Sequence, residues 1–221
     1  MPSSTTIDPP AEAVAVAQQY YRHSRPLTGL VALTTAGVVG VGYLLLSFWQ
    51  WLLVSAVLLA IVRVPLYTTG GEYRLATAKP PETVRDEFES PTPPVLALQW
   101  GLADSIEATD DGGRFEISYL FGVRSVTVTT ACRPTPNAPD SDFELVVTEG
   151  DDPWGRYQCT IDTAHSNEID AETRIDIDVQ AGRRFGLRRL PQWMVATRYR
   201  DAGLEAQGYT VVDRDGNLSL L

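Results

Sequence analysis

The chain has 221 residues, enough for one ordinary domain with accessory segments. Its 28 acidic side chains outnumber its 18 basic ones and give a formal net charge of −10. Such a charge repels polyanions, so the composition argues against nucleic acid as a partner.

A polar segment, residues 1–26, precedes an uncharged run of 37 residues from Pro26 to Val62. A single helix of that length would measure about 55 Å, whereas the hydrocarbon core of a bilayer is about 30 Å thick. The run therefore predicts two transmembrane helices within residues 27–67, roughly Leu27–Leu46 and Trp51–Tyr67. One long tilted span with a re-entrant remainder is the alternative.

Basic residues flank the uncharged run, and the turn between the two predicted spans has none. Arg22 and Arg25 precede the run, and Arg63, Arg74 and Lys79 follow it. The positive-inside rule then predicts a multi-pass protein of the cell membrane with both termini in the cytoplasm. A cleaved signal peptide is disfavoured, because the apolar run is too long and begins too late.

The soluble domain, residues 72–221, opens with a predicted strand at Glu72–Thr77 and a short helix from Pro81 to Ser90. A long strand is expected at Leu96–Ala108. Apolar and polar residues then alternate, which indicates an antiparallel sheet with one buried and one solvated face, over residues 115–121, 126–132, 143–147, 157–161 and 175–179.

A helix is predicted from about Leu187 to Gln207, with Trp193, Met194 and Leu204 on its buried side. It should end at Gly208. The turn residues 213–216 predict a terminal hairpin between Val211 and Leu220.

The order of these elements, together with Ala76-Thr77-Ala78-Lys79-Pro80-Pro81-Glu82-Thr83-Val84, resembles the START/polyketide-cyclase-like (SRPBCC) helix-grip superfamily over residues 72–210. The resemblance implies an α+β domain in which a curved antiparallel sheet wraps around a long C-terminal helix and encloses a cavity. The membrane helices and the terminal hairpin depart from the family pattern. No catalytic signature matches, so no active site is carried over. Another α+β fold of sheet and helix is the alternative.

Two side-chain groups are candidates for binding. Aromatic residues could line a cavity between sheet and helix, although a filled core is the competing interpretation: Trp100, Tyr119, Phe121, Tyr157 and Trp193. Four arginines near the start of the long helix could contact acidic lipid headgroups or a protein partner, with pairing to the domain's own carboxylates as the favoured alternative: Arg183, Arg184, Arg188 and Arg189.

Residues with catalytic or metal-binding potential are few. His165, near Asp162, could act as a general base but is more typical of a solvated turn. Asp176 and Asp178 share the solvated face of one strand. Only two histidines and two cysteines, Cys132 and Cys159, are available, and the cysteines are expected as buried free thiols rather than a disulfide. We therefore predict no catalytic residues, no metal and no cofactor.

A single lysine and many acidic residues are also typical of proteins adapted to concentrated salt, with an ordinary acidic domain as the alternative. Together these features predict a membrane-tethered module whose cytoplasmic domain binds a lipid or another apolar small molecule. A membrane-anchored scaffold for a protein partner is the second hypothesis. An enzyme of the cyclase or hydrolase type is the third and least favoured.

Overall fold

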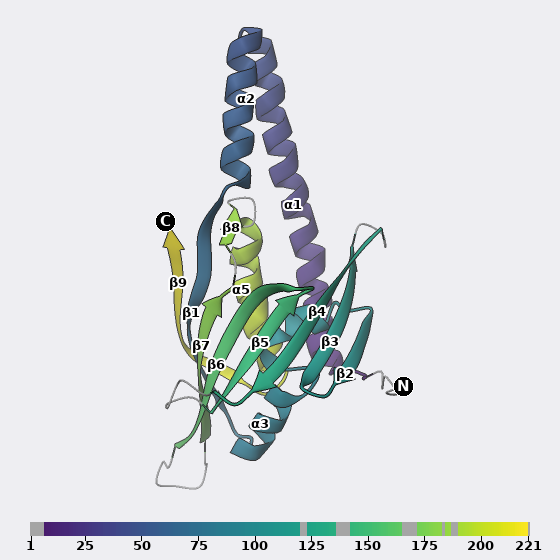
Figure 1. Ribbon diagram of the computed structural model, residues 1–221, viewed down its shortest axis with the longest axis vertical. Coiled ribbons are helices and arrows are strands. Elements are labelled where there is room, and N and C mark those ends of the chain that lie inside the picture. Colours follow the sequence, from purple (N-terminus) through teal and green to yellow (C-terminus); the bar gives the residue numbers. More distant parts are fainter. Residues whose placement is uncertain are drawn as a thin grey trace.

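The computed structural model describes residues 7–119, 123–135, 142–164, 172–182, 184–186 and 190–220. The chain is of the α+β class, with an antiparallel sheet and an N-terminal apolar helix. Two long helices extend from one end of a domain in which strands curve in front of further helices (Figure 1). The elements in chain order are α1 (Ala11–Leu45), α2 (Phe48–Arg63), β1 (Pro65–Thr77), α3 (Pro81–Glu89), η1 (Pro94–Leu96), α4 (Ala97–Trp100), β2 (Ser105–Thr109), β3 (Gly112–Tyr119), β4 (Arg124–Arg133), β5 (Phe143–Glu149), β6 (Asp152–Ala164), β7 (Glu172–Ala181), β8 (Arg184–Gly186), α5 (Leu190–Glu205) and β9 (Thr210–Leu220).

Helix α1 begins well before the uncharged run, because its first turns are rich in alanine, the strongest helix former. Ala13 and Ala17 are fully buried, and α1 contacts α4 and α5. The approach is close: a Cβ atom added at Gly101 would lie 2.6 Å from the Cβ of Ala17. From Ala11 onward, the polar N-terminal segment is therefore a helix that packs against the domain.

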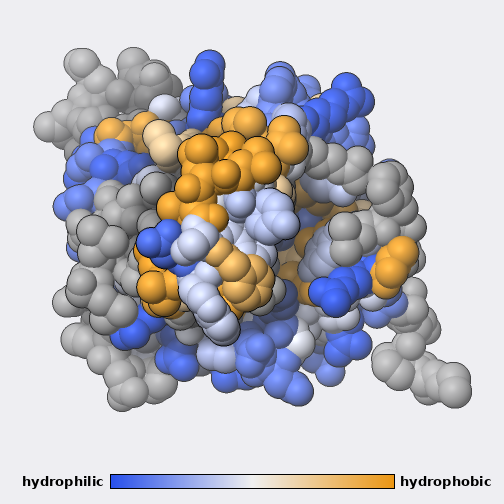
Figure 2. Space-filling model, turned by 90° about the horizontal axis from the view of Figure 1, so that it is seen from above, coloured by the Kyte–Doolittle hydropathy of each residue, from blue (hydrophilic) through white to orange (hydrophobic). Residues whose placement is uncertain are grey.

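Helix α2 lies beside the second half of α1 (Figure 1). The indole Nε1 of Trp51 donates to the carbonyl of Val39 at 2.9 Å, and its ring meets Tyr43 edge-on with 5.4 Å between centroids. Both helices expose large apolar side chains, among them Leu33, Leu44, Leu45, Trp49 and Leu53. Seen from above, hydrophobic atoms gather over these helices and hydrophilic atoms surround them (Figure 2).

The nine strands form one sheet in the order β2-β3-β4-β5-β6-β7-β1-β8, and β9 pairs with β1. All pairs are antiparallel, as the alternating pattern predicts. The register places Leu75 opposite Ile175, and Cys159 opposite both Phe143 and Ile177. These five side chains are buried on the face toward the helices, whereas their neighbours along each strand are polar except for Ala76.

Helices α3 and α5 confirm the predicted short and long helices of the domain. Helix α3 buries Val84 and Phe88 against the sheet. The segment after α5 ends at Gly208, whose φ of 83° lies in the left-handed region that glycine tolerates. One orientation on α5 was predicted wrongly: Met194 is 65% exposed and is not on the buried side.

Two predicted elements are wrong. Leu96–Ala108 is not one strand: η1 and α4 come first, and β2 begins only at Ser105. Pro93 and Pro94 fix the backbone at the start of η1, and Trp100 closes the segment through a bond from its Nε1 to the carbonyl of Pro93 at 2.9 Å. Consecutive side chains in this segment are buried, so the sequence there has no period that distinguishes a helix from a strand.

The expected terminal hairpin between Val211 and Leu220 is likewise absent from the described residues, where β9 runs as one strand through Thr210–Leu220. Asp213 and Asp215 pair with residues of β1 instead of turning the chain. The backbone partners along β1 outweigh the turn tendency of the Asp and Gly residues.

Candidate functional site: a cavity between sheet and helices

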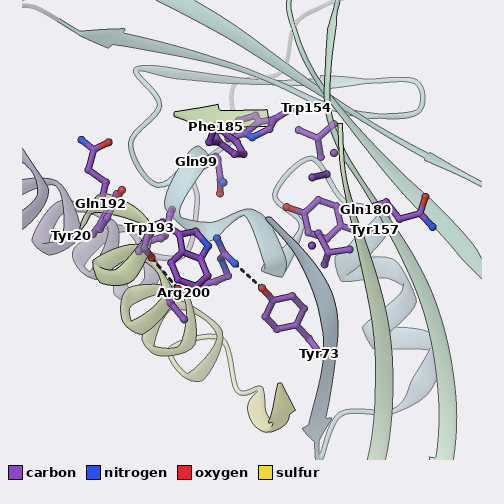
Figure 3. A pocket seen from close by; sticks show the side chains of 18 of the residues that line it. Tyr20, Tyr73, Gln99, Trp154, Tyr157, Gln180, Phe185, Gln192, Trp193 and Arg200 are labelled. Atoms are coloured by element: carbon purple, nitrogen blue, oxygen red, sulfur yellow. Dashed lines mark hydrogen bonds between the residues drawn. The ribbon is translucent and has the colours of Figure 1, made fainter. Parts of the chain in front are cut away.

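A partly open cavity of about 510 Å³ lies between the inner face of the sheet and helices α1, α4 and α5. Its lining is mixed: aromatic and aliphatic side chains predominate, with a few polar groups among them (Figure 3). The labelled lining residues are Tyr20, Tyr73, Gln99, Trp154, Tyr157, Gln180, Phe185, Gln192, Trp193 and Arg200. Concave, largely apolar sites with a few polar handles are the usual form of ligand pockets.

The sheet side of the cavity follows from strand alternation. Tyr157 on β6 stands opposite Val179 on β7, and both point inward with Val147 of β5. Gly155 contributes no side chain where its neighbour Val147 faces the cavity, which leaves room in front of the strands. These residues form the apolar wall.

The helix side comes from one face of α5. Trp193, Ala196, Thr197 and Arg200 line the cavity at spacings of three, four and seven residues, which is the period of one helical face. The Thr197 hydroxyl donates to the carbonyl of Trp193 at 2.9 Å, so it is satisfied within the helix. The small side chains of Ala196 and Thr197 leave the space that the cavity occupies.

The polar corner of the cavity, defined here as Tyr73, Tyr157, Arg200 and Arg214, holds two guanidinium groups. Arg200 Nη1 donates to the hydroxyl of Tyr73 at 3.0 Å, as the dashed line in Figure 3 marks. The guanidinium carbon of Arg214 lies 4.9 Å from the centroid of the Tyr73 ring. Arg214 also pairs with Asp201, whereas none of the carboxylates in the described residues forms an ion pair with Arg200.

The surroundings of the Tyr157 hydroxyl in the polar corner change its pKa. Burial raises the pKa of Tyr157, and the positive charge of Arg200 acts in the opposite direction. The hydroxyl is therefore protonated at neutral pH and can donate a hydrogen bond into the cavity.

Two buried polar atoms around the cavity have no hydrogen-bond partner among the described residues: Gln99 Oε1 and Arg214 Nε. Gln99 projects from α4 into the cavity (Figure 3). Unsatisfied buried polar groups are uncommon in native proteins, and such groups usually bond to a bound water or ion.

Two of the five predicted cavity aromatics, Tyr157 and Trp193, line this cavity. Trp100 does not, because it is only 1% exposed and belongs to the packed core. Tyr119 lies at the end of β3, opposite Arg124 and away from the lining. Phe121 lies outside the described residues.

The arrangement also includes residues that sequence patterns did not single out. Tyr73 belongs to the predicted first strand, and Trp154 and Phe185 lie where strands begin. Tyr20 comes from the segment that we expected to be merely polar. The helical spacing from Trp193 was the one signal that could have found Arg200.

The remaining candidates lie elsewhere. Arg184 is exposed on β8, and Arg183, Arg188, Arg189 and His165 lie outside the described residues. Asp162 is exposed. On the solvated face of the sheet, Asp176 pairs with Arg74 at 2.7 Å, and Asp178 accepts from Gln180 at 3.2 Å.

Both cysteines are free thiols. Burial raises the pKa of Cys132 to about 11 and that of Cys159 well above its ordinary value, so neither is a reactive thiolate at neutral pH. Among the described residues, no three His, Cys, Asp or Glu side chains come together as metal ligands would.

Comparison with known proteins gives no assignment: no protein-family model, no curated protein and no solved structure matches the chain. One helix, α1, is long and apolar enough to cross a membrane by length and composition, and α2 is a shorter apolar helix.

Proposed function

We propose that the protein is a membrane-anchored binding module whose domain holds a lipid or another apolar small molecule in the cavity beneath α1 and α2. The observation that carries the proposal is the cavity of about 510 Å³ with its aromatic and aliphatic lining. Its volume falls within the range of roughly 300–1,000 Å³ typical of small-molecule sites.

In this proposal α1 and α2 are two transmembrane spans, and the domain lies on the cytoplasmic side with both termini. The packing supports two crossings rather than one. Ala13 and Ala17, at the start of α1, are buried against the same domain into which α2 leads. If α1 alone crossed, its first turns and the domain would lie on opposite sides of the membrane.

Helix α2 is short for a transmembrane span. Its 16 residues span about 24 Å, less than the hydrocarbon core of about 30 Å. A bilayer thins around a short span at a cost of fractions of a kcal/mol per Å of mismatch. The indole bond from Trp51 to Val39 and the exposed apolar side chains on both helices suit such a pair.

We further propose that the domain is of the helix-grip type, with the sheet curved around α5. The order of elements and the position of the cavity between sheet and α5 support this assignment. The position of β8 is also relevant: it contacts α2 and carries the exposed Arg184, which suits a lipid headgroup.

The membrane anchor favours binding of a molecule that comes from the bilayer. A tethered pocket meets bilayer-derived molecules at a high effective concentration, so a modest intrinsic affinity suffices for occupancy. Phe185 and Trp193, which line the cavity, come from β8 and from the first turn of α5, and β8 contacts α2.

The test is native mass spectrometry of the full chain released from its membranes in mild detergent, followed by solvent extraction. We expect a reproducible extra mass of a few hundred daltons that extracts as one class of compound. Ala196→Trp fills the cavity and should abolish that mass. Met194→Trp adds the same side chain on the exposed face of α5 and should retain it.

A folded wild-type protein that carries no extra mass would contradict the proposal. The membrane-anchored scaffold would then be the better hypothesis, and capture of partners from native membranes would follow.

A further inference from the structure

The polar corner of the cavity has a charge that an uncharged apolar ligand does not explain. Arg200 and Arg214 contribute two positive charges, and Asp201 contributes one negative charge through its pair with Arg214. One positive charge is left at the inner end of the cavity, in a protein whose formal net charge is −10. A cation that is partly desolvated is stabilised by an anion placed beside it.

The hydrogen-bonding groups at this corner are mostly donors. Arg200 has five N–H groups, of which one bonds to Tyr73 among the described contacts. Arg214 Nε is buried without a partner, and the protonated hydroxyl of Tyr157 faces the same space. Asp201 is the opposing acceptor, and it already pairs with Arg214. The corner therefore lacks an acceptor with several lone pairs.

The volume limits the rest of the ligand. A methylene group occupies roughly the volume share of one water molecule in the liquid, about 30 Å³. A partly open cavity of about 510 Å³ is therefore of a size that suits one long alkyl chain with a small head.

The charge of the polar corner limits the chemistry of the ligand's head group. A carboxylate carries one negative charge and matches the single uncompensated positive charge, with planar oxygens that suit a guanidinium. A phosphate monoester carries about −1.5 to −2 at neutral pH and would leave a surplus of negative charge beside Asp201.

We propose that the cavity binds a single-chain carboxylic acid, with its carboxylate on Arg200 and its alkyl chain along Val147, Val179 and Trp193 toward α1 and α2. The inference rests on the proposed function and names the ligand class of the same site. Arg200 acts as the binding residue for the head. Tyr73 holds the guanidinium in place.

The experiment uses the full chain in lipid nanodiscs with three photoreactive probes: a diazirine-bearing hexadecanoic acid, the corresponding primary alcohol, and the corresponding phosphate monoester. The labelled peptides are identified by mass spectrometry. We expect the acid to label cavity residues at least about tenfold more than the alcohol, because hydrogen bonds to a charged head discriminate by that order. We also expect it to label more than the phosphate monoester.

Arg200→Gln should reduce labelling by the acid by about tenfold or more, and labelling by the alcohol should change little. Arg198→Gln is the matched control, because Arg198 is exposed on the same helix and does not line the cavity. Tyr73→Phe keeps the guanidinium and should retain acid labelling within about threefold. An equal loss in Tyr73→Phe and Arg200→Gln would indicate collapse of the cavity and would overturn the inference.

The outcomes separate this inference from the proposed function. If acid and alcohol label the cavity equally, and Arg200→Gln has no effect, the binding module stands and the acid head is wrong. Preference for the phosphate monoester would also overturn the carboxylate assignment. If none of the probes labels the cavity, the proposed function itself fails.

Discussion

The space between the sheet and the helices is filled with side chains at one end and open at the other, although the same sheet lines both ends. At the filled end, Phe88 from α3 meets Phe143 of β5 at 5.9 Å and Tyr209 at 6.1 Å between ring centroids. At the open end, Tyr157 of β6 and Val179 of β7 line the cavity.

The difference arises from small residues on both sides of the open end. Helix α3 brings a large side chain, Phe88, against the sheet. The open end instead has Ala196 and Thr197 on α5 and Gly155 on β6. Alternation along a strand thus determines which side chains point inward, and the size of the facing residues determines whether the interior closes. Close packing is the norm in protein interiors, so the open end is where we propose that a ligand binds.

The largest expected effect tests the two ends against each other. Phe88→Ala removes a fully buried ring and should cost about 3–5 kcal/mol of unfolding free energy. Trp193→Ala should cost less than about half as much, since one side of its indole already borders the cavity. Urea unfolding of the full chain in detergent, followed by circular dichroism, measures both. Equal losses would mean that the open end is packed as tightly as the filled one.

A second substitution tests the packing of α1 on the open end, where α1 contributes Tyr20 to the lining of the cavity. Gly101→Ala places a Cβ atom 2.5 Å from the carbonyl oxygen of Ala97 and 2.6 Å from the Cβ of Ala17, so the packing of α1 on α4 must loosen at a cost of about 1–3 kcal/mol. Gly37→Ala is the control, because nothing lies within 4 Å of its added Cβ atom. It should leave stability unchanged or raise it by up to about 1 kcal/mol. If Gly101→Ala is equally harmless, the first turns of α1 are not packed on the domain.

The sequence alone predicted the features that depend on local periodicity. Alternation identified the antiparallel strands, and the Pro81-Glu82 start and the glycine after α5 located two helices. Sequence patterns could not resolve segments in which consecutive side chains are buried, such as Val95 to Leu98, because such runs have no polar face to set a period.

The candidate site was predictable only in part, for a related reason. Tyr157 and Trp193 lie in regular elements and were found, but Tyr20 and Tyr73 reach the cavity only through contacts between distant segments. The placement of Arg200 depends on the pitch of α5, whose buried side we misplaced by including Met194. Long-range pairing of β9 with β1 also overrode a local turn signal.

The smallest expected effect compares a phenol from each end as the pH rises. Burial, and then the hydrogen bond from its hydroxyl to Glu87 at 2.5 Å, raise the pKa of Tyr209, and burial raises that of Tyr157 against the influence of Arg200. A phenol with a raised folded pKa contributes stability that is complete below its ordinary pKa of about 10 and is lost as the pH rises toward the folded value. Above about pH 10, each such group lowers the unfolding free energy by up to about 1.4 kcal/mol per pH unit.

Tyr209→Phe should therefore flatten the decline of stability between about pH 10 and 12 more than Tyr157→Phe does, because Arg200 narrows the range over which Tyr157 contributes. Urea midpoints of the full chain and of both variants across this pH range measure the difference. The thiols of Cys132 and Cys159, whose pKa values are also raised, are present in all three proteins. If Tyr157→Phe instead flattens the decline of stability more than Tyr209→Phe does, the Tyr157 hydroxyl is more strongly desolvated than an open cavity and a nearby guanidinium allow. The two ends of the interior would then be alike.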